Sequence, residues 1–157
     1  MSLSAPQSRA YDGAAFKVGI VAARFNEELV DGLLARVAAE LHAAGVKPQK
    51  ITTVRVPGSH EVPWAAGRLA DKKGFDVVIA LGGLIGGDTN HHEMVGQSVS
   101  HALQQVALAG GVPVINGVIV TATPAQARAR CTGKINRGVE FARAALEMSA
   151  LRRTLQS

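Results

Sequence analysis

The most regular feature of the sequence is a set of four short apolar runs separated by longer amphipathic segments. The runs cover residues 17–23, 51–56, 75–81 and 112–120. The first, third and fourth are almost continuously apolar, which is the pattern of strands buried on both faces. The second is shorter and closes at a Pro-Gly pair, as a strand before a turn does. Four strands are therefore expected.

The segments between the runs predict helices. After the first run, apolar residues recur at positions 29, 30, 33, 34, 37 and 41, which lie on one helical face. Asn26 is the candidate N-cap of this helix, and Gly45 is a plausible end. Thr123, Pro124 and Gln126 form a capping box with proline at the first helical position. The other expected helices cover about 62–73, about twenty residues ending near 110, 124–131 and 134–153.

Regular alternation of strand and helix predicts a parallel sheet covered by helices on both faces. We expect a polar, flexible N-terminal arm over residues 1–15 and a single domain over residues 16–157. Ligands of such folds bind outside the carboxyl ends of the strands. Four loops are expected at that edge: residues 24–26, 57–61, 82–91, and those at or beyond 116.

Composition narrows the class of protein. Apolar residues make up 47% and aromatic residues only 4%, so an aromatic residue in a polar loop stands out. The net charge of +5 comes from scattered basic residues, which fits an anionic small substrate at least as well as nucleic acid. The single cysteine excludes an internal disulfide and suits a reducing compartment. No run reaches transmembrane length, so we expect a cytoplasmic protein with no membrane or nucleic-acid partner.

The third loop carries the densest chemistry. Gly86-Gly87-Asp88-Thr89 stands where a strand is expected to end and a helix to begin. Glycines let backbone amides face a ligand, and the helix start adds partial positive charge, so this loop is a candidate anion site. The alternative is a tight turn with Thr89 or Asn90 as the N-cap. The glycine spacing matches neither a Walker A loop nor a dinucleotide fingerprint.

The consecutive residues His91 and His92 should face different sides of the coming helix. His91, beside the anion site, is the candidate proton-transfer residue, and His92 is expected to point elsewhere. Solvated histidines at a helix start are the alternative. A metal site would need these two with His60, Asp88 and Glu93, but the spacing fits no established metal motif. No metal is expected.

Other loops add candidates for binding. Phe25 could stack on a planar ring, or it could be a hydrophobic staple at the helix start. Ser59-His60-Glu61 could bond the edges of such a ring, or could only cap the next helix. Arg130 could reach a phosphate, although surface arginines are commonly just solvated. Two more residues are not expected to take part in catalysis. Trp64 is expected to lie in the core, and Cys131 is not expected to act as a catalytic thiol.

Taken together, five blocks of the chain resemble the lumazine synthase family. They are Ala23-Arg-Phe-Asn26, Val56-Pro-Gly-Ser-His-Glu-Val-Pro63, Ala80-Leu-Gly-Gly-Leu-Ile-Gly-Gly-Asp-Thr-Asn-His91, Pro113-Val-Ile-Asn-Gly-Val118 and Ala144-Ala-Leu-Glu-Met148. Each block alone is weak, but their order over about residues 17–155 is specific. The resemblance implies the fold of this family, which is a three-layer α/β/α sandwich with a four-stranded parallel, flavodoxin-like sheet.

The resemblance implies the penultimate reaction of riboflavin biosynthesis, without cofactor or metal. The family joins 5-amino-6-(D-ribitylamino)uracil to 3,4-dihydroxy-2-butanone 4-phosphate and releases phosphate and water. His91 would transfer protons. The uracil substrate would contact Phe25, Asn26, Ser59, His60, Glu61, Gly83, Leu84, Ile85 and Asn116. The phosphate substrate would contact Gly87, Asp88, Thr89 and Arg130.

The resemblance also implies that several copies of the chain assemble. The sequence departs from the family pattern at three places. Sites of this family lie between subunits of a pentamer, with Asn116 and Arg130 facing a neighbour's loops. The family usually has an aromatic or aliphatic residue at His60 and commonly Arg at Gly86. The loop 132–137 is about one residue shorter than the common form, and short loops accompany sixty-subunit shells, which can associate with riboflavin synthase. The rival functions are an archaeal-type riboflavin synthase and a non-catalytic flavin- or lumazine-binding protein.

Overall fold

The computed structural model describes residues 4–156 and confirms the three-layer α/β/α sandwich. Its sheet is parallel, with strand order β2-β1-β3-β4, which is a flavodoxin-like arrangement. The strands are β1 (Val18–Ala23), β2 (Ile51–Val56), β3 (Val77–Ile85) and β4 (Val114–Thr121). The helices are α1 (Glu27–Ala43), α2 (Val62–Ala70), α3 (His91–Gly110), α4 (Pro124–Cys131) and α5 (Arg137–Gln156), with short 3-10 turns η1 (Pro48–Lys50) and η2 (Ser59–Glu61).

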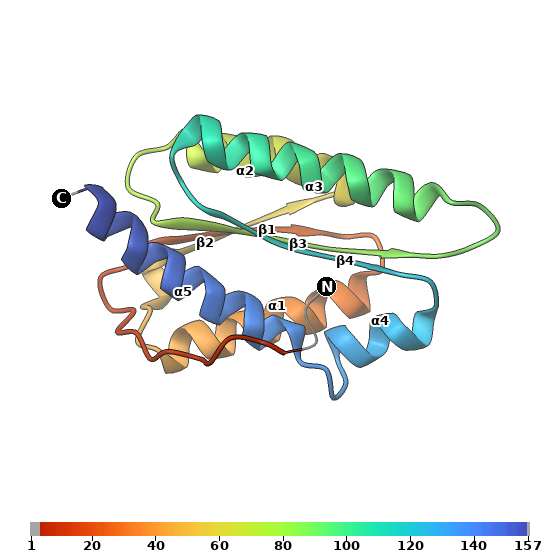
Figure 1. Ribbon diagram of the computed structural model, residues 1–157, viewed down its shortest axis with the longest axis horizontal. Coiled ribbons are helices and arrows are strands. Elements are labelled where there is room, and N and C mark those ends of the chain that lie inside the picture. Colours follow the sequence, from red (N-terminus) through yellow and green to blue (C-terminus); the bar gives the residue numbers. More distant parts are fainter. Residues whose placement is uncertain (1–3, 157) are drawn as a thin grey trace.

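The helices form one layer on each face of the sheet. Figure 1 shows α1, α4 and α5 below the sheet, and α2 and α3 side by side above it. Each layer has its own apolar core. Val18, Ile20 and Ile79 pack against α1 and α5, whereas Val21, Val78 and Ala80 face α2 and α3. Burial on both faces explains why β1 and β3 are continuously apolar in sequence.

The length of β3 corrects the prediction for this part of the chain. The apolar run was expected to end at Leu81, with a loop from Gly82 onward. Instead the strand continues through Ile85, and its last residues pair with β4 from Gly82↔Val118 to Ile85↔Thr121. The pairing of β1 with β3 stops at Leu81. The last four residues of β3 therefore have a neighbouring strand on one side only.

The signals at helix ends hold in part. The capping box before α4 is confirmed, because the Gln126 amide donates to Thr123 Oγ1 and the Thr123 amide donates to Gln126 Oε1, each at 3.2 Å. Gly45 follows α1 with φ 94°, as a helix stop requires. Asn26 stands at the N-cap position of α1, but its side chain does not cap the helix. Its φ of 56° turns the side chain toward β3 instead.

Two other expectations meet the described structure. Trp64 was predicted in the core, but the structure leaves it 74% exposed on α2, which corrects that prediction. Of the predicted N-terminal arm, residues 1–3 lie outside the described part. Within the rest, Tyr11 packs against the core under α1 and α5, and the Gly13 amide donates to the Ala44 carbonyl at 2.7 Å.

A buried carboxylate ties the amino ends of the central strands to the last helix. Asp76 is 3% exposed and accepts the Lys17 amide at 2.8 Å. The Arg153 guanidinium binds both of its oxygens, at 2.8 and 3.1 Å, and also donates to the Ala15 carbonyl. The hydrogen bond to Asp76 raises the pKa of Arg153. This contact fixes α5 across the edge of the sheet opposite the predicted loops.

We predict that Asp76→Ala lowers the free energy of unfolding by about 1–3 kcal/mol, because the Lys17 amide loses its acceptor and Arg153 loses its ion pair. Asp71→Ala is the matched control, since its ion pair with Arg68 is 3.7 Å long and exposed, and it should cost less than about 1 kcal/mol. Chemical denaturation measures both. Equal losses in the two variants would contradict the role given to Asp76.

Candidate active site

A cavity of about 690 Å³ lies near the predicted loops, at the carboxyl edge of the sheet. Segments from four parts of the chain meet there: the β1–α1 loop, η2, the end of β3 and the start of α3. All but three of the site residues predicted from sequence line this cavity. The predicted residues that line it are Phe25, Asn26, Ser59, His60, Glu61, Gly83, Leu84, Ile85, Gly87, Thr89 and His91.

The floor of the cavity is the unpaired edge of β3. The amides of Val78 and Gly86 donate toward β4, to Pro113 and Thr121. The backbone N–H and C=O groups of successive residues point to opposite edges of a strand. Those of Gly83 and Ile85 therefore point to the edge where β1 has ended. Asn26 Nδ2 donates to the Gly83 carbonyl at 2.9 Å. The remaining edge groups, including the Ile85 amide and carbonyl, are available to a planar ligand with donors and acceptors.

Phe25 stands beside this strand edge. Its amide donates to the Pro57 carbonyl at 3.0 Å, which joins the β1–α1 loop to the turn after β2. The ring is 70% exposed although it lines the cavity. A hydrophobic staple would bury its ring against the helix, so the exposure favours the alternative, a surface on which a ligand ring can stack.

The second wall is η2, held by its own acidic residue. Glu61 Oε2 accepts the Gly58 amide at 2.9 Å, so one carboxylate oxygen shapes the turn. Ser59 is 4% exposed, and its Oγ has no hydrogen-bond partner within the described chain. A buried hydroxyl without a partner is costly. The side chain of His60 is exposed on the same turn and makes no hydrogen bond to a described residue.

The third wall is the start of α3 and the loop before it. The Thr89 hydroxyl accepts the His91 amide at 3.4 Å, and Asn90 occupies the N-cap position without a side-chain bond. Gly87, Thr89 and His91 all line the cavity at the amino end of a 20-residue helix. The helix dipole and the exposed amides favour an anion here. Asp88 is exposed in the same loop but does not line the cavity.

His92 corrects the expectation that only one of the paired histidines faces the site. It lines the same cavity as His91, together with Met94 and Val95, which sequence reasoning missed. Its Nδ1 is buried without a partner among described residues, and its Nε2 lies 3.9 Å from Glu93 Oε1. Helical spacing separates the two rings around the axis, yet both residues line the cavity.

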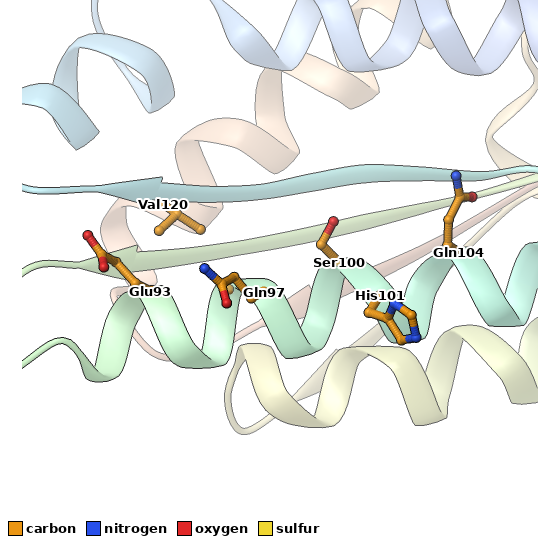
Figure 2. A pocket seen from close by; sticks show the side chains of 7 residues that line it. Glu93, Gln97, Ser100, His101, Gln104 and Val120 are labelled. Carbon is orange, nitrogen blue, oxygen red and sulfur yellow. The ribbon is translucent and has the colours of Figure 1, made fainter. Parts of the chain in front are cut away.

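Besides Asp88, two predicted site residues lie outside this cavity. Asn116, on β4, donates to Ser100 Oγ at 3.2 Å and accepts the Val118 amide at 3.1 Å. Arg130, on α4, donates to the Gln126 carbonyl at 3.0 Å. A second hollow of about 580 Å³ runs between α3 and the free edge of β4. Figure 2 shows Glu93, Gln97, Ser100 and Gln104 extending from α3 toward β4, and Val120 facing them.

Gly86 is explained by packing and not by ligand binding. A Cβ at this position would lie 2.5 Å from the Ala122 carbonyl oxygen and 3.1 Å from two other backbone atoms of Ala122. Backbone cannot move aside as a flexible side chain can. The chain therefore has no room for the Arg that the resemblance implies at this position. At Gly87, in contrast, a Cβ would meet no atom within 4 Å.

Metal and thiol chemistry find no support among residues 4–156. No three histidine, cysteine, aspartate or glutamate side chains in this range are placed to hold a metal ion. Cys131 is 1% exposed, and burial raises the pKa of its thiol against the opposing charges of Arg36 and Arg130. A buried protonated thiol is a poor nucleophile. The same range contains no helix with the length and apolarity needed to cross a membrane.

The fold and the cavity define a flavodoxin-like α/β protein with a small-molecule site at the carboxyl edge of its sheet. The profile of one family, 6,7-dimethyl-8-ribityllumazine synthase, matches residues 15–153. Relatives with that name share 39% identity in Azoarcus sp. (strain BH72), covering 92% of this chain and 91% of the relative, and 38% in Thermococcus kodakarensis, covering 93% and 92%. A Coxiella burnetii relative is 42% identical, covering 91% and 95%. The chain belongs to the 6,7-dimethyl-8-ribityllumazine synthase family.

We predict that Gly86→Ala lowers the free energy of unfolding by about 1–3 kcal/mol, because its methyl group overlaps the Ala122 backbone. Gly87→Ala is the matched control one residue away and should change it by less than about 0.5 kcal/mol. Thermal and chemical unfolding compare the two. A stable Gly86→Ala protein would show that this loop is not held against Ala122.

Proposed function

We propose that the chain catalyses the reaction of its family, as a transferase in riboflavin biosynthesis. The substrates are 5-amino-6-(D-ribitylamino)uracil and 3,4-dihydroxy-2-butanone 4-phosphate, and the products are 6,7-dimethyl-8-ribityllumazine, phosphate and water. The observation that carries this proposal is one cavity in which an exposed aromatic ring, a free strand edge and an imidazole at a helix start meet. These are the features that a flat heterocycle and a phosphate ester require.

The uracil substrate would bind along the edge of β3. The exposed Phe25 ring can stack on its heterocycle, and the groups of Gly83 and Ile85 that face the cavity can pair with uracil N–H and C=O groups. Leu84 has its backbone directed to β4, so it would contribute its side chain. Ser59 and Glu61 would bind the polar substituents. Supporting this, Ser59 Oγ lacks a partner within the described chain.

The phosphate substrate would bind at the start of α3. Gly87 and Thr89 offer a backbone amide and a hydroxyl beside the positive end of the helix dipole, and Asp88 would orient that loop. The ester phosphate then lies next to His91.

The chemistry needs proton transfer at several atoms. The 5-amino group adds to the ketone and loses water to form an imine. Loss of phosphate follows, with removal of a proton from carbon, and the second amine then closes the ring. His91 can accept and return protons beside the departing phosphate. Holding both substrates in one cavity lowers the barrier of the first step. The overall reaction needs no external oxidant or reductant, so it requires no redox cofactor.

A second copy of the chain would complete the site. Asn116 and Arg130 carry the groups expected at the uracil and the phosphate, yet neither lines this chain's cavity. The hollow between α3 and the β4 edge is open, and β4 is an edge strand (Figure 2). We propose a pentamer in which these elements meet a neighbour's cavity. The short loop at 132–137 favours further assembly into a sixty-subunit shell in the cytoplasm, where riboflavin synthase could associate with it.

We predict that His91→Ala lowers kcat by about 100-fold and changes the Michaelis constants much less, because proton transfer matters in the transition state. The assay mixes both substrates and follows lumazine absorbance and released phosphate. His42→Gln, an exposed histidine at the far end of α1, is the control and should keep full activity. No lumazine from the folded wild-type protein would contradict the proposed function, and equal losses in binding and turnover would remove His91 from catalysis.

A further inference from the structure

Three of the five histidines in the chain line a single cavity: His60, His91 and His92. They come from two separate elements, because His60 lies on η2 and the other two lie in the first turn of α3. The described residues form no metal-binding group of three, so these rings do not converge on one ion. Separate imidazoles in a cavity of this size can act on different atoms of a bound ligand.

Of these three histidines, His60 is the one whose ring has no hydrogen-bond partner among the described residues and which lies on a different wall from the proposed phosphate site. His92 has a buried Nδ1, and its Nε2 faces Glu93. His91 follows directly on Gly87 and Thr89 at the helix start. His60 is exposed, makes no hydrogen bond to a described residue, and shares its wall with Phe25 and Ser59. Both of its ring nitrogens are therefore available to a ligand.

We propose that His60 is a second catalytic residue, which transfers protons in the ring closure while His91 serves the phosphate end. The inference rests on the proposed function, because it takes the heterocycle to lie beside Phe25. Because Ser59 and Glu61 on η2 would bind the polar substituents of the uracil substrate, its ribityl-bearing nitrogen, which closes the ring, would lie on the η2 side of the cavity. The charged and titratable groups that share this cavity with His60 are Glu61 on its own turn and His91 and His92 on α3.

The ring closure has a defined proton balance. The nitrogen that carries the ribityl chain forms a bond to the remaining ketone carbon, and the carbon–oxygen bond breaks. The oxygen leaves as water and so takes up two protons. One comes from the attacking nitrogen and the other from a ring N–H of the uracil, which leaves the product uncharged. A single imidazole can accept each proton on one nitrogen and deliver one from the other.

The neighbouring groups suit this task less well. The carboxylate of Glu61 is engaged by the Gly58 amide through Oε2. An ordinary carboxyl group is also already ionised near neutral pH and has no proton to supply, whereas an imidazole exchanges protons in that range. Ser59 Oγ is buried and has no hydrogen-bond partner in the described chain, so no acid or base is bonded to it. His60 is thus the group on this wall that can both give and take a proton.

The test separates the two halves of the reaction by following phosphate and lumazine in the same single-turnover experiment. In the wild-type protein and in the His42→Gln control the two products should appear together. In His60→Phe, which keeps a ring of similar size, and in His60→Gln, phosphate should appear at least ten-fold faster than lumazine. His91→Ala should slow both products in step.

Each outcome decides the proposal. A lag of lumazine behind phosphate in both His60 variants, with assembly and melting temperature unchanged, supports it. Phosphate and lumazine appearing in step in those variants, at any rate, overturns it, even if turnover falls. Wild-type protein that makes no lumazine would instead refute the proposed function, so the two failures are distinguishable.

Discussion

The site depends on a difference in length between neighbouring strands. β3 continues four residues beyond the point where β1 stops pairing with it, while β4 accompanies it to the end. A strand edge inside a protein must find partners for its N–H and C=O groups. Here one carbonyl is taken by Asn26, and the others face the cavity. The edge is thus held open by the sheet itself and does not need a mobile loop.

Other parts of the site are fixed against this edge. Asn26 adopts a left-handed backbone conformation that a helix cap would not need, and the bond to Gly83 offsets its strain. That bond positions Phe25, whose amide is fixed to Pro57 at the base of η2. η2 in turn presses Ser59 so closely on β3 that a side chain at Gly82 would overlap its Oγ at 2.5 Å. The β1–α1 loop and η2 therefore both take their positions from one strand.

Features of the fold that depend on residues close together in the sequence could be predicted, whereas those that depend on residues far apart in the chain could not. Buried strands, helix periodicity and the Thr123 capping box are local signals, and the structure agrees with them. The end of β3 was missed because Gly82 and Gly83 suggest a loop, whereas pairing with β4 keeps them in the strand. Gly86 depends on the backbone of Ala122, 36 positions away in the chain, and no sequence pattern reveals such a contact. Trp64 was placed in the core by its apolarity alone, although α2 turns it outward.

The candidate residues were found because loops at one edge of a parallel sheet converge. The resemblance implies that Asn116 and Arg130 come from a second chain, and contacts within one chain do not test this. Mixed assembly answers this most directly. One form carries Phe25→Ala and His91→Ala, the other carries Asn116→Ala and Arg130→Ala, and Arg128→Ala is the matched control that stays active alone. If the site is shared, co-expressed mixtures of the two inactive forms should regain activity at about a quarter of their sites. Mixed oligomers that form and remain inactive would contradict a site completed by a second copy.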